Sequence, residues 1–242
     1  MKKNNLYILI FLISIIILMN SCCRMFDHCI HGNGRVMSET RDCYYFEDLV
    51  NEGDFNVYFT KGDQFSLVVE AEENLLKYID TEFHGNTLYI ENDHRRCLDC
   101  SYPMNIYITA PDVYSLKLTG SGLIHSNNLA VPELDLELTG SGNIDLFLET
   151  EHVNVNLTGS GDVILAGYSN SSDYILTGSG EINSFSMEQE TSIMDVIGSG
   201  DIYVNAGEMI DVKIVGSGDV HYMGNPQIYS TILGTGKLRK WD

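Results

Sequence analysis

Apolar and polar residues alternate in short segments through the second half of the chain, and each segment runs into a glycine. Before Gly120, for example, Leu116 and Leu118 are apolar while Lys117 between them is polar. The alternation resumes after the glycine with Ile124. An apolar period of two is typical of a strand with one buried face, and it excludes a helix. The pattern therefore predicts strand, glycine corner and strand.

This unit is repeated along the chain. Gly-Ser-Gly occurs at 120–122, 140–142, 159–161, 178–180, 198–200 and 216–218, and Gly-Thr-Gly at 234–236. Two short strands and two corners use about 19 residues, so each repeat starts in the same phase and stacks on the previous one at ~4.8 Å. The sequence thus predicts an all-β fold, a parallel β-helix or solenoid of two sheets with about seven coils of 18–20 residues.

Glycines form the corners of this predicted solenoid because they adopt positive φ without a Cβ penalty. The predicted structural turns are Gly120, Gly122, Gly140, Gly142, Gly159, Gly161, Gly178, Gly180, Gly198, Gly200, Gly216, Gly218, Gly234 and Gly236. The crossover rule favours a right-handed coil, although hexapeptide solenoids wind the other way.

Residues 44–111 are less regular but still alternate, as in 55–59, 65–69 and 104–108. We interpret them as the irregular start of the solenoid or as a β-layer over its first coil, because an open coil end is an unpaired edge. Residues 44–242 then form a single domain, with regular repeats from 112. At the C-terminal end of the solenoid we expect the stack of coils to be ended by three charged residues and one bulky aromatic residue: Lys237, Arg239, Lys240 and Trp241.

The N-terminus carries export signals. Lys2 and Lys3 precede an apolar run over 6–19, which would cover roughly 21 Å as a helix and is short of the ~30 Å of a bilayer core. Residues 18–22 end in Cys22 and resemble the lipobox of bacterial lipoproteins. We therefore predict a lipoprotein signal peptide at 1–21, lipidation of Cys22 and a flexible tether at 22–43. The alternative is an ordinary signal peptide in which Cys22 and Cys23 are incidental.

The net charge of the chain limits the kinds of partner that it can bind. The chain has 34 Asp and Glu against 14 Lys and Arg, a net charge of −20, which would repel nucleic acid. With 44% hydrophobic residues it has enough apolar content to fold, so disorder is excluded. We expect an exported protein held to the membrane by its N-terminal lipid, in the outer membrane and facing the periplasm or the surface.

A Thr-Gly-Ser-Gly ladder, with Thr119, Thr139, Thr158 and Thr177, follows the leader and the alternating N-terminal part. Together these features resemble the family of Bacteroidetes-type bacteria described as "putative auto-transporter adhesin, head GIN domain". The resemblance covers about residues 44–242. It implies a two-sheet β-superhelix, similar to pectin-lyase-like solenoids but without their catalytic residues, and a role in cell adhesion. The cysteines are not part of that pattern.

No residue set for catalysis stands out. The serines of Gly-Ser-Gly lack the strand-to-helix elbow and the base of a nucleophile, so we interpret them as turn formers. Acidic residues follow several corners, at Asp162, Glu181, Asp201 and Asp219. Their spacing fits a calcium repeat poorly, and a solvated acidic edge is favoured over a metal site. The sequence therefore predicts no cofactor.

Four cysteines lie within or near the predicted domain. Cys97 and Cys100 form a C-x-x-C that could bind zinc or act as a redox pair with Cys29 and Cys43. Because exported cysteines usually pair, disulfides among these four are favoured. The sequence leaves the connectivity open.

Apolar residues replace the ladder threonine in the last three coils, at Ile197, Val215 and Leu233, with Ile175 nearby. Residues at this position face outward, so the three should stack into an exposed apolar strip. Such a strip is either covered by a chain segment or marks an interface. Cover by the Trp241 tail and self-association into a homo-oligomer are both open.

The function that these observations favour is a non-enzymatic, lipid-anchored β-solenoid of the cell envelope that adheres to a surface glycan or protein. One alternative is an enzyme of pectin-lyase-like architecture acting on polysaccharide, which would need catalytic residues converging on one groove. The other is a purely structural envelope lipoprotein without a dedicated ligand.

Overall fold

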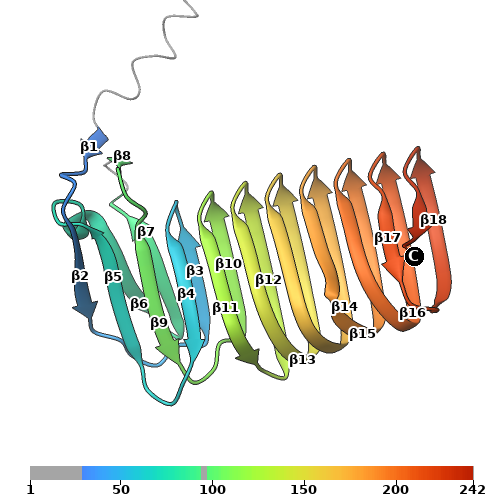
Figure 1. Ribbon diagram of the computed structural model, residues 1–242, viewed down its shortest axis with the longest axis horizontal. Coiled ribbons are helices and arrows are strands. Elements are labelled where there is room, and N and C mark those ends of the chain that lie inside the picture. The colour runs from blue at the N-terminus through green and yellow to red at the C-terminus, as the bar shows by residue number, and fades with distance from the viewer. Residues whose placement is uncertain (1–28, 94–96, 242) are drawn as a thin grey trace, which may run out of the picture.

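The computed structural model describes residues 29–93 and 97–241 and shows a long stack of β-coils (Figure 1). Its first strands are β1 (Cys29–His31), β2 (Val36–Arg41), β3 (Asp48–Glu52), β4 (Asn56–Lys61), β5 (Ser66–Glu72), β6 (Ile79–His84), β7 (Thr87–Asn92), β8 (Cys97–Asp99) and β9 (Asn105–Ala110). The repeats contain β10 (Ser115–Gly120), β11 (Leu123–Ala130), β12 (Glu133–Gly140), β13 (Asn143–Gly159), β14 (Asp162–Gly178), β15 (Glu181–Gly198), β16 (Asp201–Gly216), β17 (Val220–Met223), β18 (Gln227–Gly234) and β19 (Leu238–Lys240). A short 3-10 helix, η2 (Leu76–Tyr78), precedes β6. Within these residues no helix has the length and hydrophobicity to span a bilayer.

The coils have two walls. Wall A consists of the strands that run into a glycine corner: β3, β10, β12, the second halves of β13 to β16, and β18. Wall B consists of the strands that leave the corner: β4, β11, the first halves of β13 to β16, β17 and β19. All these ladders are parallel, which confirms the predicted two-sheet solenoid.

The glycine corners stack directly on one another. Gly120, Gly140 and Gly159 are partners in register, and the amides of Ser141 and Gly142 each donate to the Gly120 carbonyl at 3.0 Å. A Cβ on Gly140 would lie 2.3 Å from that carbonyl oxygen, and the φ of Gly140 is +131°. Only glycine fits this close approach of backbones. The predicted row of glycine corners is therefore present. The expectation of positive φ is wrong for the second glycine of each corner: Gly142 has no positive φ, and glycine is needed there because a Cβ would lie 2.6 Å from the Gly122 carbonyl oxygen.

Alternate side chains of both walls fill the interior. Leu116, Leu136 and Val155 are paired in register and buried. The same column continues to Tyr174, which is also fully buried. Its phenol donates to Gln189 Oε1 at 3.1 Å, so a small polar layer is satisfied inside the coils.

The N-terminal part joins the stack out of sequence order. β3 and β4 form a coil that packs beneath β10 and β11, and β7 and β9 form the next coil outward. The end is then closed by antiparallel strands, β6 on β7 and β5 on β9, with β2 beyond β5. Figure 1 shows this cap at the blue end of the stack. The predicted irregular start and the predicted covering layer are thus both present.

The prediction of a tether at 22–43 is wrong for residues 29–43, because β1 and β2 lie there. β2 forms a ladder with β5 along its whole length, and the Arg41 guanidinium donates to the carbonyls of Leu76 and Ile79 at 2.8 and 2.7 Å. The side chains of β2 are mostly exposed, so β2 lacks the alternation of apolar and polar residues that predicted the other strands. The predicted signal peptide, Cys22 and the rest of the tether lie outside the described residues.

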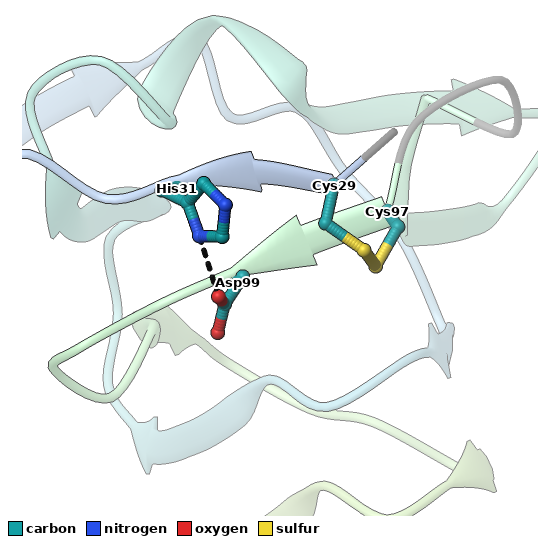
Figure 2. Close-up of a disulfide and its surroundings, with 4 residues drawn as sticks. All are labelled: Cys29, His31, Cys97 and Asp99. Carbon is teal, nitrogen blue, oxygen red and sulfur yellow. Dashed lines mark hydrogen bonds and ion pairs between the residues drawn. A yellow bond between two sulfur atoms is a disulfide. The ribbon is translucent and has the colours of Figure 1, made fainter. Parts of the chain in front are cut away.

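A clasp of β1, β8 and Glu72 holds the N-terminal segment. Figure 2 shows the disulfide between Cys29 and Cys97, and His31 Nδ1 lies 2.6 Å from Asp99 Oδ2 on the same two strands. The buried Glu72 carboxylate accepts hydrogen bonds from the amide of Gly34 and, at 2.7 Å, from that of Ser101. These contacts tie the start of the described chain to the cap.

Only half of the predicted disulfide set pairs. Cys29 and Cys97 are partners in the parallel ladder of β1 and β8, which brings their side chains together. Cys43 and Cys100 are free thiols, so their expected participation is wrong. Cys100 lies just beyond the end of β8, where no cysteine is its register partner.

The C-terminal end is open. β18 pairs with β16, and no other strand of the described chain forms a ladder with it. All eight residues of β18 are exposed, although Ile228 and Ile232 lie over the buried Ile210 and Ile214. The C-terminal residues that were predicted to end the stack do not cover this strand, because Trp241 packs on the outside of wall B.

Candidate binding face

The outside of wall B carries one continuous column of side chains along the stack. The register runs through Tyr107, Tyr58, His125, Asp145, Ile164, Asn183, Tyr203, His221 and Arg239. Aromatic rings occupy the first three positions of this column and the two positions before Arg239, and aliphatic and polar side chains occupy its middle. We name the two groups of rings the proximal and distal platforms.

The proximal platform consists of Tyr58, Tyr107 and His125. The two tyrosine rings stack with centroids 5.3 Å apart and planes 18° apart, and the His125 ring meets Tyr58 edge-on at 6.1 Å. Asn127 and Asn128 line the same surface hollow, whose volume is about 480 Å³. The platform therefore combines flat rings with amide groups that both donate and accept hydrogen bonds.

Carboxylates border the proximal platform. The Tyr107 hydroxyl donates to Glu70 Oε1 at 3.3 Å, and His125 Nδ1 lies 3.2 Å from Asp145 Oδ2. Desolvation, followed by the negative charge of Glu70, raises the pKa of the Tyr107 phenol. The hydroxyl hydrogen of Tyr107 is thus directed toward Glu70.

The distal platform consists of Phe185, Tyr203, His221 and Trp241. Tyr203 and His221 stack at 4.8 Å with planes 8° apart, and Trp241 lies edge-on to His221 at 5.6 Å and tilted against Phe185 at 5.8 Å. Partial burial raises the pKa of the Tyr203 phenol, and the nearby carboxylates of Glu181 and Asp201 add to this effect. The rings form a compact aromatic surface at the C-terminal side of wall B.

The two platforms lie on the same face and at a fixed distance. Five coil steps separate Tyr58 from Tyr203, which places them about 24 Å apart at ~4.8 Å per step. A rigid ladder holds this spacing, so both platforms can contact one extended ligand.

The predicted acidic column is present beside the corners. Asp162, Glu181 and Asp201 are partners in register. Asp201 Oδ1 accepts the amide of Asp219 at 2.7 Å, and Asp219 in turn accepts the amide of Lys237 at 2.8 Å. These carboxylates bind the backbone of the next coil. Across the described residues, no group of three or more His, Cys, Asp or Glu side chains is arranged to hold a metal.

The corner serines lie exposed at the edge of the stack. Ser121 donates to Asp54, and Thr235 donates to Ser217 at 3.2 Å. Both contacts join one corner to the corner of an adjacent coil, as expected for turn-forming residues.

The predicted apolar strip is present on wall A. Ile197, Val215 and Leu233 are partners in register and are 46%, 37% and 60% exposed. Ile175 is exposed in the neighbouring column. The tail-cover hypothesis is wrong, because Trp241 packs with the distal platform on the other wall.

Sequence reasoning missed both platforms. The distal pair could have been found, because Tyr203 and His221 occupy the same outward position in consecutive repeats. The proximal pair could not be found in this way, since Tyr107 stacks on Tyr58 through the out-of-order coil of β7 and β9.

The fold and the outward side chains define a class of protein: a two-walled parallel β-solenoid with two long exposed faces. The chain belongs to the family described as "Putative auto-transporter adhesin, head GIN domain", whose profile matches residues 45–226. No curated protein matches it.

Solved structures share the whole fold. One is described as a "putative adhesin" from Bacteroides fragilis; it is 26% identical, with a TM-score of 0.80, over 88% of this chain and 100% of that chain. Another, a "Putative lipid binding protein" from Parabacteroides distasonis, is 24% identical, with a TM-score of 0.75, over 88% and 99% of the two chains. A "putative adhesin" from Parabacteroides merdae is 18% identical, with a TM-score of 0.70, over 89% and 100%.

Proposed function

We propose that this protein is a non-enzymatic, lipid-anchored adhesin of the cell envelope, and that wall B binds an extended neutral glycan across its two aromatic platforms. The observation that carries the proposal is the pair of platforms on one rigid face. The family description and the names of the structural neighbours agree with a binding role at the cell envelope.

The chemistry of the platforms suits sugars. An aromatic ring offers a flat apolar face with a polar tip in tyrosine. Asn127 and the second carboxylate oxygen of Asp145 supply hydrogen-bond partners for hydroxyl groups, while the Asn128 amide is bonded to the backbone of Lys61. The chain carries a net charge of −20, which repels acidic polysaccharides. A neutral glycan therefore fits this face better than an acidic one.

The anchor follows from the leader. A lipid on Cys22 would attach the chain next to β1, at the capped end of the stack. The eight strands of wall A continue at the capped end into β7 and β6. These ten strands extend about 43 Å from the cap to the open end. Wall B would then rise from the membrane with its proximal platform near the surface and its distal platform farther out.

Glycan-array binding followed by titration tests the binding face. We expect Tyr58→Ala and Tyr203→Ala each to weaken binding by a few-fold to about tenfold, since one aromatic contact contributes about 0.5–1.5 kcal/mol. The matched control is Tyr114→Ala, which removes an exposed tyrosine that belongs to neither platform. Equal binding by all three variants, or no glycan bound by the native chain, would contradict the proposal. Turnover of a bound polysaccharide would instead support an enzyme.

Metabolic labelling with a fatty acid tests the anchor separately. Cys22→Ser should abolish incorporation and release the protein from the membrane fraction, whereas Cys23→Ser should retain both. Incorporation that survives in Cys22→Ser would refute lipidation at this residue. Protease treatment of intact cells then shows whether the folded domain faces the outside.

A further inference from the structure

The outer edge of β18 is a complete strand edge without a partner in the described chain. Ile228 and Ile232 are 40% and 38% exposed, yet they occupy the inward positions that are fully buried one coil earlier. The backbone groups of this edge point along the stack, where another coil would pair with them. Such an edge is a template for a further strand.

We propose that this open end binds the open end of a second copy of the chain, with β18 of each copy antiparallel to β18 of the other around Ser230. The two solenoids then share a continuous wall A and are related by a twofold axis.

The sequence of β18 is self-complementary in this register. With Ser230 opposite Ser230, Ile228 of each copy lies opposite Ile232 of the other, because residues equidistant from the axis pair in an antiparallel ladder. Inward residues meet inward residues, so the two interiors join and the exposed isoleucines are covered. A shift by one residue would place inward against outward side chains.

The other end of this molecule shows that its coils accept an antiparallel strand. β6 lies antiparallel on β7, and β5 lies antiparallel on β9, at the end of otherwise parallel walls. In the proposed dimer, β18 of the second copy takes the place on β18 that β6 takes on β7.

Charge also favours a second copy at this place. β18 has no charged residue, whereas the whole chain carries −20, and edge strands are commonly protected from pairing by charged side chains. Two copies that approach by their walls would repel each other strongly. β18 itself therefore exposes apolar area without any charge of its own. Lys237, Arg239 and Lys240 follow it in the same coil, where Arg239 is paired with Asp219 at 3.1 Å.

The contact area is modest. The end face measures roughly 27 Å by 20 Å, from the length of β18 and two walls ~10 Å apart with their outward side chains, so pairing buries roughly 1,000 Å² in total. This area lies at the lower limit of specific interfaces, and we expect a reversible dimer.

Cysteine cross-linking tests the register. Under mild oxidation we expect Ser230→Cys to form a covalent dimer, because its symmetry mate is its direct partner. Thr231→Cys should not cross-link, since its symmetry mate lies on a diagonal at about 7–8 Å, beyond the usual Cα separation of a disulfide. The native chain, with free thiols at Cys43 and Cys100, gives the background. Cross-linking of Thr231→Cys with no reaction of Ser230→Cys would overturn the register.

Sedimentation from low micromolar to near-millimolar concentration tests the association itself. The mass of the native chain should rise from one copy to two. Ser230→Lys places two ammonium groups opposite each other and should weaken the dimer at least tenfold, while Thr158→Lys, on wall A of an interior coil, should behave as the native chain does. The proposal would be overturned if the native chain stays monomeric throughout, or if Ser230→Lys does not weaken the dimer. The occupant of the β18 edge would then be a strand of another protein.

The dimer has a consequence that also rests on the proposed anchor at Cys22. Pairing by the open ends places the two capped ends about 90 Å apart and facing away from each other. Anchored copies could pair in this way between two membranes. Failure of lipidation in the labelling experiment would remove the bridging role, whereas the solution dimer would be unaffected.

Discussion

At each end of the solenoid the outermost coil has a strand edge whose backbone groups need partners. The N-terminal edge is covered by other strands of the chain, and the C-terminal edge is not covered by any strand that the structure describes. At the N-terminal end, β6 and β5 lie antiparallel on the outermost coil, and η2 and β2 add a further layer. At the C-terminal end, β18 keeps Ile228 and Ile232 at the inward positions of the strand beneath it. It has Ser230 in place of the buried Val212 between them, and it is exposed along its whole length. The comparison shows that the repeat itself does not specify an end, and that closing the stack requires a segment of different sequence.

The difference also predicts a gradient of stability. Each coil of a solenoid contacts only its neighbours, so its stability depends on how many neighbours it has. Interior coils have a neighbouring coil on each side, while the coil that contains β18 has only one neighbour within the described residues. The same substitution should therefore cost far more in the middle of the stack than at the open end.

A corner substitution should have the largest effect. Gly159→Ala would place a Cβ 2.2 Å from the Gly140 carbonyl oxygen at a φ of +133°. We expect a loss of about 4 kcal/mol in the free energy of unfolding, measured by denaturant titration, because the backbones above and below prevent relaxation.

The open end supplies the comparison for this variant. In Gly234→Ala the added Cβ would lie 2.0 Å from the Gly216 carbonyl oxygen, but no coil of the described part of the chain lies beyond β18 to prevent this strand from moving. We expect a loss of no more than about 1–2 kcal/mol. Gly34→Ala, with a φ of +77° and no atom within 4 Å, isolates the backbone strain alone. Similar losses in Gly159→Ala and Gly234→Ala would show that the two positions are equally constrained.

Core truncation should have the next largest effect. Ile214 is fully buried, and Ile232 occupies the same position one coil later at 38% exposure. Ile214→Ala should cost about 3 kcal/mol, whereas Ile232→Ala should cost under about 1 kcal/mol at low protein concentration. If the dimer forms, the cost of Ile232→Ala should grow as the protein is concentrated. A cost for Ile232→Ala equal to that for Ile214→Ala would mean that the end is closed in the monomer.

The repeating coils could be predicted from the sequence because their information is local. Each coil is specified by about 19 residues, and an apolar period of two beside a glycine determines which side chains are buried, as Leu116 and Leu136 show. The stacking of corners then follows from equal spacing. The acidic column and the apolar strip were predicted by the same reasoning.

The strand pairing within the cap could not be predicted because its contacts join distant segments. β2 and β5 are about thirty residues apart in sequence, and β3 pairs with β10 across the whole N-terminal part. Neither pairing recurs along the sequence at a fixed spacing, so no repeat reveals which strands pair. For the same reason Cys97 could not be chosen over Cys43 or Cys100 as the partner of Cys29, since the choice depends on the register of β1 against β8.

The clasp at the capped end offers a third test. Glu72→Gln leaves one acceptor oxygen where the carboxylate has two, so the amide of Gly34 or of Ser101 faces an NH₂ group. We expect a loss of about 2 kcal/mol and faster hydrogen exchange at those two amides. Glu133→Gln, at an exposed position of β12, should change neither. Unchanged exchange in Glu72→Gln would show that the clasp does not depend on the charge.

The smallest effect we predict concerns the closed interior at high pH. Burial raises the pKa of the Tyr174 phenol to about 12, against a value of 10 for an exposed tyrosine. The unfolded chain therefore releases this proton first, so the stability associated with the neutral phenol is complete below pH 10 and is lost as the pH rises from 10 to 12.

At pH 11 the loss attributable to Tyr174 is about 1 kcal/mol. Tyr174→Phe should remove this part of the alkaline slope while lowering stability at neutral pH by the hydrogen bond to Gln189. Along the register, the position of Tyr174 passes through Met194 and Val212 to Ser230 on the open strand, where the side chain is exposed. A phenol there would meet water in the monomer, so Ser230→Tyr should add no such slope at low concentration. Stability curves of the native chain and Tyr174→Phe that run parallel between pH 10 and 12 would contradict a sealed interior and, with it, the contrast between the closed coils and the open end.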